Sequence, residues 1–172
     1  VSSMGSHVSV VPNHQLNRKT PLHTRANVAY FGTFGYELDL NKLSDEEISE
    51  VKQQITFMKE YRELIQFGTF YRLKSPFEGN ETAWMIVSED KKTALVFWYR
   101  ERNVVNADFT RVRLQGLDPD LIYRNEYNET ENYGDELMNL GLLTTDCTAG
   151  EPTSEDEPCT DYESRIYVLT AK

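Results

Sequence analysis

Residues 44–68 read SDEEISEVKQQITFMKEYRELIQFG, the strongest secondary-structure signal in the chain. Ser44 stands three residues before Glu47, the spacing of a capping box, and acidic residues follow it where a helix dipole favours negative charge. These signals predict a helix that begins after Ser44 and ends at Gly68. Apolar residues recur along it at steps of three and four, so one face should be buried. The predicted stripe comprises Ile48, Val51, Ile55, Met58, Arg62 and Ile65, widened by Tyr61 and Leu64.

Short aromatic and β-branched runs replace the helical period after Gly68. The predicted strands are residues 69–73, 83–87, 93–99, 111–114 and 165–169. The second and third should form a hairpin, and the third is apolar on both alternations, so we expect a central strand covered on both faces. A turn is expected at residues 116–119 and a short helical turn around Leu137 and Met138. This part of the chain therefore predicts an antiparallel, β-sandwich-like domain.

Upstream of the helix, residues 8–11 form a β-branched run that ends at Pro12, which is typical of one buried strand followed by a loop. A short helix at residues 22–31 should follow, stopping at Gly32. The fold class is therefore α+β, with two domains, residues 1–67 and 68–172. The first residues resemble neither a natural start nor a signal peptide, so we expect an interior cut; a vector remnant at residues 5–7 is the alternative.

The charge balance excludes several classes of partner. Lys and Arg total 18 and Asp and Glu 28, which gives a net charge of −10. Because counterion release needs clustered cations, nucleic acid is not an expected partner. No window approaches the roughly 20 apolar residues that cross a bilayer, so no membrane partner is expected either.

We predict a mobile acidic surface loop at residues 144–164. It carries Cys147 and Cys159, which are either bonded to each other or free.

Residues with catalytic or metal-binding chemistry are sparse. The histidines are His7, His14 and His23, and they lack the HExxH spacing of a zinc site, so no metal is expected. Asn13 and His14 follow the first strand, where a ligand contact and simple loop capping are both open. The acidic neighbourhood of Cys147 disfavours a nucleophilic thiolate.

Trp84, Trp98 and Tyr99 raise an alternative function. Aromatic rings on an exposed sheet could stack against sugars, as in a carbohydrate-binding module. Because both alternations of the third strand are apolar, however, at least one of the two tryptophans should lie in the core.

Five motifs occur in a characteristic order along the chain. They are MGSHVSVVPNHQ (residues 4–15), LHTRANVAYFGTFGYELDL (22–40), QFGTFYRL (66–73), GLDPDLIYR (116–124) and GDELMNLGL (134–142). Together they resemble the bacterial melibiase-type alpha-galactosidases, glycoside hydrolase family 36. The likeness covers nearly the whole chain. The acidic segment with both cysteines looks like an insertion into a hairpin that is usually shorter.

The resemblance implies the C-terminal region of such an enzyme. Residues 1–67 would hold the eighth strand and last helix of a catalytic (β/α)8 barrel plus a long linking helix, and residues 68–172 an antiparallel β domain. The intact enzyme would hydrolyse terminal alpha-galactosyl residues of melibiose- and raffinose-type sugars with retention, using two carboxylates. Nothing in this chain matches the family's Lys-Trp-Asp nucleophile stretch, so we expect no catalytic residue here and an inactive chain with a structural job.

The resemblance also places the loop after the first strand near the barrel mouth, which makes Asn13 and His14 candidates for substrate binding. It implies no cofactor. A cytoplasmic homo-oligomer is expected for the full-length enzyme.

Overall fold

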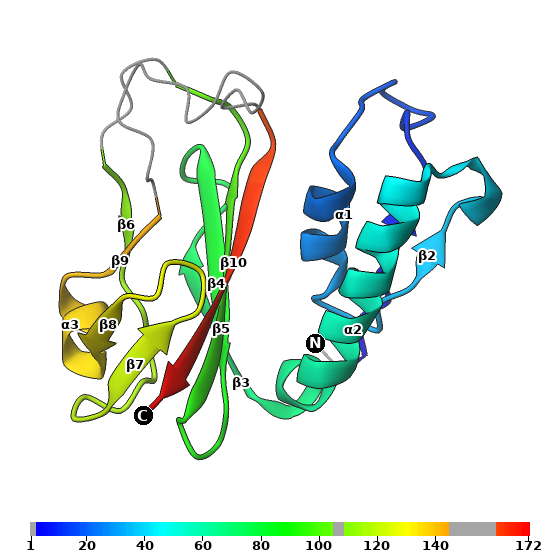
Figure 1. Cartoon of the computed structure of the whole chain (residues 1–172). Coiled ribbons are helices and arrows are strands. Elements are labelled where there is room, and N and C mark those ends of the chain that lie inside the picture. Colours follow the sequence, from blue (N-terminus) through cyan, green and yellow to red (C-terminus); the bar gives the residue numbers. More distant parts are fainter. Residues whose placement is uncertain (1–2, 105–108, 145–160) are drawn as a thin grey trace. The chain divides into compact units, whose positions relative to one another are not determined.

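The computed structural model describes residues 3–104, 109–144 and 161–172, and the chain forms two compact units, Val1–Gly68 and Thr69–Lys172 (Figure 1). Most helical residues lie in the first unit, and most strand residues lie in the second. The α+β class is thus confirmed, with an antiparallel sheet in the second unit. Cys147 and Cys159 lie outside the described residues. No helix within the described residues is long and apolar enough to cross a membrane.

The first unit is built from two strands and two helices. Its elements are β1 (Val8–Ser9), α1 (Leu22–Ala29), β2 (Tyr36–Glu37), the 3-10 helix η1 (Leu40–Lys42) and α2 (Asp45–Phe67). The sequence predicted one strand here, but β1 and β2 pair in parallel, with Val8 opposite Tyr36 and Ser9 opposite Glu37. A parallel pair needs a crossover connection, and α1 is the helix in that crossover. The order β1-α1-β2-α2 is therefore two successive strand–helix repeats.

Helix α2 has the predicted ends. The Ser44 hydroxyl accepts a hydrogen bond of 3.2 Å from the Glu47 backbone N–H, and the Ser44 N–H donates one of 2.9 Å to the Glu47 carboxylate. At the other end, the Gly68 N–H donates to the Leu64 carbonyl at 2.8 Å. The capping box and the stop at Gly68 are confirmed.

The buried face of α2 differs from the predicted stripe. Val51, Met58 and Ile65 are buried as predicted, but the face also includes Gln54, whereas Ile55 and Arg62 are exposed. A residue turns the helix by about 100°, so a face centred near Met58 takes in position 54 and leaves 55 at its border. The apolar pattern alone placed the stripe to one side of the face that the fold buries.

The second unit is a six-stranded antiparallel sheet with a small second layer. The sheet order is β3 (Thr69–Lys74), β4 (Glu81–Val87), β5 (Thr93–Arg100), β10 (Glu163–Ala171), β7 (Ile122–Asn125) and β8 (Glu131–Tyr133). The predicted β4–β5 hairpin and the central place of β5 are confirmed. Most of the predicted acidic loop, residues 145–160, lies outside the described residues, and β10 begins at Glu163, before the predicted end of that loop at residue 164. Strands β7 and β8 were not predicted.

The second layer packs on one face of that sheet. It consists of the two-stranded pair β6 (Arg111–Val112) and β9 (Leu142–Leu143) with helix α3 (Gly134–Asn139), the helical turn that the sequence predicted. The core between the layers includes Met85, Val96, Trp98, Leu114, Leu137, Leu142 and Tyr167. Trp98 is fully buried there, which confirms that at least one tryptophan belongs to the core. The second layer has fewer strands than a β-sandwich would.

Candidate functional site

The two faces of the β1–β2 pair have different surroundings. Ser6 donates its hydroxyl to the carbonyl of Ala29, the last residue of α1, and Val8 is fully buried. Tyr36, opposite Val8 in the pair, donates its hydroxyl to Gln54 of α2 at 2.8 Å. Side chains alternate between the faces of a strand, so Ser6, Val8 and Tyr36 define the face that packs on the helices.

The opposite face carries His7, Ser9 and Glu37. Nε2 of His7 lies 2.7 Å from Oε2 of Glu37, and their side chains are 51% and 74% exposed. Ser9 is opposite Glu37 in the register, so His7, which lies two residues before Ser9 and just ahead of β1, approaches Glu37 diagonally. Sequence reasoning considered His7 but missed Glu37. Strand alternation could have placed Glu37 beside His7 only if β2 had been predicted as a partner of β1, and it was not.

A depression of about 210 Å³ opens along β1 beside these residues. The residues that line it include His7 and Ser9, the loop residues Asn13 and Arg18, and Arg25 of α1, and none of the described lining residues is a carboxylate. Arg25 donates Nε to the Thr20 carbonyl at 3.0 Å and Nη1 to the Ser9 carbonyl. Burial lowers the pKa of Arg25, an effect that the negative charges of nearby acidic side chains on α2 oppose. Arg25 therefore fixes the loop onto the strand.

The two candidates in that loop differ in exposure, Asn13 being half-buried and His14 exposed. Oδ1 of Asn13 accepts hydrogen bonds of 3.0 Å from the N–H groups of Gln15 and Leu16. This contact is the loop-capping arrangement that was one of the two open interpretations. His14 is exposed beside it.

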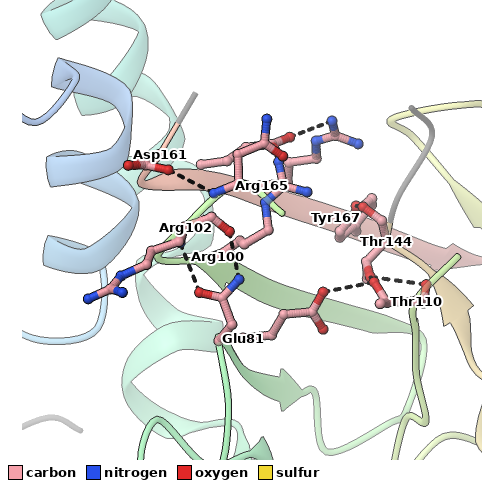
Figure 2. A network of polar contacts seen from close by, with 11 residues as sticks. Glu81, Arg100, Arg102, Thr110, Thr144, Asp161, Arg165 and Tyr167 are labelled. Atoms are coloured by element: carbon pink, nitrogen blue, oxygen red, sulfur yellow. Dashed lines mark hydrogen bonds and ion pairs between the residues drawn. The ribbon is translucent and has the colours of Figure 1, made fainter. Parts of the chain in front are cut away.

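The second unit has a polar network at one end of its sheet (Figure 2). Thr110 donates to Oε1 of Glu81 at 2.8 Å and lies 3.1 Å from the Thr144 hydroxyl, while the Tyr167 hydroxyl donates to the Thr144 carbonyl at 3.3 Å. Nearby, Oδ1 of Asp161 accepts a bond of 2.7 Å from the backbone of Asn103. The contacts join β4 and β10 to the chain segments that flank β6 and β9.

A charged cluster adjoins the network. The Glu163 carboxylate forms two ion pairs. Its Oε2 accepts from Nη2 of Arg100, and its Oε1 accepts from Nη2 of Arg165 at 2.6 Å. The arginines lie 5.6 and 5.9 Å from the ring centre of Trp98, so their charges also face an aromatic ring. Because these side chains are tied to one another and to the core, we interpret the cluster as structural.

Of the three aromatic residues considered for a sugar platform, Trp98 is lost to the core, whereas Trp84 and Tyr99 are partly buried and lie against each other with ring centres 4.7 Å apart. Burial raises the pKa of Tyr99 well above its usual value. In the described ranges, no three His, Cys, Asp or Glu side chains gather in a way that could hold a metal ion.

Comparisons with known families match the chain in two consecutive pieces. Residues 1–68 match the family described as Melibiase. Residues 81–169 match the family described as "Glycosyl hydrolase family 36 C-terminal domain". The two matches confirm the resemblance that the motifs carry.

Several known proteins are similar over most of this chain. Alpha-galactosidase AgaA of Geobacillus stearothermophilus is 52% identical over 142 residues, 83% of this chain and 19% of that protein. Alpha-galactosidase Mel36A of Lactobacillus acidophilus is 48% identical over 141 residues, 82% of this chain and 19% of that protein. This chain thus spans about a fifth of the length of these relatives.

Solved structures show the same likeness. The galactosidase domain of the alpha-galactosidase-sucrose kinase AgaSK superposes with a TM-score of 0.88 at 41% identity, covering 99% of this chain and 22% of that one. An AgaA variant in complex with stachyose gives a TM-score of 0.89 at 46% identity, over 99% of this chain and 22% of that one. Another AgaA variant, in complex with raffinose, gives 0.86 at 46% identity, over 98% and 22%.

Proposed function

Since the chain belongs to glycosyl hydrolase family 36, we propose that it is the C-terminal region of an alpha-galactosidase. The intact enzyme would remove terminal alpha-galactosyl residues from sugars of the melibiose and raffinose type, with retention. Relatives that carry the name alpha-galactosidase and AgaA variants bound to raffinose and stachyose support this assignment. The observation that carries it is that two family matches from the same kind of enzyme follow each other along the chain.

The first unit would be the end of the catalytic (β/α)8 barrel. The parallel pair β1 and β2, the crossover helix α1 and the following helix α2 have the order of two barrel repeats. We propose that β1 and β2 are the seventh and eighth strands. This replaces the sequence-based expectation that residues 8–11 form the eighth strand, because a further parallel strand follows them.

The division of labour follows from that placement. A full barrel takes about 250 residues, and its active site collects residues from several strand ends. Two repeats supply one side of such a site, so residues 1–67 would complete the barrel while residues 68–172 form the appended antiparallel domain. We propose no catalytic residue in this chain. Asn13 would shape the loop at the barrel mouth, with His14 exposed there.

Activity measurements test the proposal. The full-length polypeptide should hydrolyse a chromogenic alpha-galactoside, and the product released first should keep the alpha configuration by NMR. Residues 1–172 alone should show no turnover at equal molar concentration. Turnover by this chain alone, or a full-length protein that is folded yet inactive on alpha-galactosides, contradicts the proposal.

The carbohydrate-binding module remains the alternative, and its support is weakened by the burial of Trp98. Galactose or raffinose titrated against tryptophan fluorescence of this chain should leave the signal unchanged. A saturable change would favour the module.

The family resemblance also supports a cytoplasmic homo-oligomer as the state of the full-length enzyme. Light scattering of the full-length protein should give a multiple of the monomer mass. A monomer at micromolar concentration contradicts that state.

A further inference from the structure

If the chain is a barrel end, the face of the β1–β2 pair that carries His7 and Glu37 has a defined place, and a role for that face rests on the proposed function. In a (β/α)8 barrel the helices form the outer ring, so the strand face opposite the one that packs on the helices lines the interior. Ser6, Val8 and Tyr36 pack on the helices. His7 and Glu37, on the other face, would therefore project into the barrel.

Glu37 lies where barrel active sites are built. It is the last residue of β2, and catalytic and binding groups in this fold come from the carboxyl ends of strands. His7 lies deeper along the neighbouring strand, since the residue opposite Glu37 is Ser9. The imidazole thus meets the carboxylate from the side of the barrel floor, at 2.7 Å.

The carboxylate has one oxygen left for another partner. Among the described residues, His7 is the only side chain that Glu37 contacts through an ion pair or hydrogen bond, and the contact uses Oε2. Arg25, which lines the neighbouring depression with His7, donates its hydrogen bonds to the Ser9 and Thr20 carbonyls. Oε1 of Glu37 is therefore placed to accept a hydrogen bond from a group inside the barrel.

We propose that Glu37 is a substrate-binding residue whose Oε1 accepts a hydrogen bond from a hydroxyl of the galactoside, and that His7 positions the carboxylate. A hydroxyl bonded to an ionised acceptor makes a shorter and stronger hydrogen bond than one between neutral groups. A neutral, hydroxyl-rich sugar is the ligand that such an acceptor suits. Both residues belong to this chain, although bond cleavage requires groups outside it.

The test uses the full-length enzyme with Glu37→Gln, His7→Ala and the double variant. Glu37→Gln should raise KM for an alpha-galactoside about tenfold with kcat changed less, because a bond kept in ground and transition states affects binding alone. His7→Ala should also raise KM, by a smaller factor than Glu37→Gln does. In the double variant, His7→Ala should add nothing, because its effect passes through Glu37.

Two further variants separate this role from a structural one. His7→Gln keeps a side-chain donor and should restore much of the affinity lost in His7→Ala. Glu129→Gln is the matched control, because Glu129 forms an exposed pair with Arg124 at 2.9 Å in the second unit, and it should leave KM unchanged. Galactose should raise the unfolding temperature of the wild-type enzyme and raise that of Glu37→Gln less at the same concentration.

The outcomes are distinguishable. A folded Glu37→Gln enzyme with wild-type KM and an undiminished galactose shift overturns the inference and leaves the alpha-galactosidase assignment intact. A lower unfolding temperature with unchanged KM likewise overturns it, since the pair would then be structural only. A folded wild-type enzyme that neither cleaves alpha-galactosides nor is stabilised by galactose overturns the proposed function itself.

Discussion

The Tyr36 hydroxyl donates a hydrogen bond of 2.8 Å to Oε1 of Gln54, and this contact joins strand β2 to helix α2. Gln54 is only 6% exposed, and its side-chain nitrogen donates to Glu50 at 2.8 Å. The buried amide is therefore satisfied on both ends. That arrangement lets a polar residue occupy the inner face of the helix at low cost.

Removing the hydroxyl should destabilise the first unit. Tyr36→Phe leaves the Gln54 oxygen buried without this donor, which should cost about 1–3 kcal/mol of unfolding free energy in urea titrations of this chain. Combining Tyr36→Phe with Gln54→Leu should recover part of the loss, since both partners are then apolar. A single variant as stable as the wild type would show that the bond contributes nothing.

Alkaline pH should weaken the same contact. Burial, followed by the charge of Glu50, raises the pKa of Tyr36 from its ordinary 10.0 to about 12. The unfolded chain then loses the tyrosine proton before the folded chain does, so the stabilising effect is complete below pH 10 and is lost as the pH rises toward 12. Unfolding titrations across that interval should show a steeper loss of stability for the wild type than for Tyr36→Phe. Equal slopes would contradict the shifted titration.

Local signals in the sequence predicted the elements that local chemistry determines. Ser44 and Glu47 form their capping box within one turn of chain, and Gly68 ends the helix, so both features follow from spacing. The long apolar run of β5 likewise predicted its central place. These predictions needed no information about distant residues.

The features that sequence reasoning missed depend on contacts across the chain. Gln54 is buried because Tyr36 reaches it from another element, and a pattern of apolar residues cannot include an amide. Strand β2 has two residues, one of them acidic, so only its pairing with β1 identifies it. The His7–Glu37 pair depends on that pairing, which is why Glu37 was not among the predicted site residues.

Gly116 should tolerate no side chain. Its φ is +75°, and an added Cβ would lie 2.3 Å from the Tyr71 hydroxyl oxygen and close to the ring. Gly116→Ala should therefore cost more than about 1 kcal/mol in unfolding free energy, from backbone strain and overlap together. Gly79→Ala is the control, because nothing lies within 4 Å of its added Cβ, and it should change stability little. Equal unfolding midpoints for the two variants would contradict this account.

Glu163→Gln should be among the most damaging single changes in the second unit. The Glu163 carboxylate meets two guanidinium groups, and the Arg100 side chain is only 7% exposed. Losing the negative charge leaves a buried cation without compensation, and breaking such a pair costs about 3–5 kcal/mol when burial is complete. We expect a loss somewhat below that range, since the Glu163 side chain is 18% exposed.

The exposed pair of Arg124 and Glu129 gives the comparison, because Glu129→Gln should cost about 1 kcal/mol or less. Urea unfolding of both variants measures the difference. Similar small losses in the two would mean that solvent reaches the Glu163 cluster, whereas a large loss confined to Glu163→Gln would show that the buried Arg100 depends on this carboxylate.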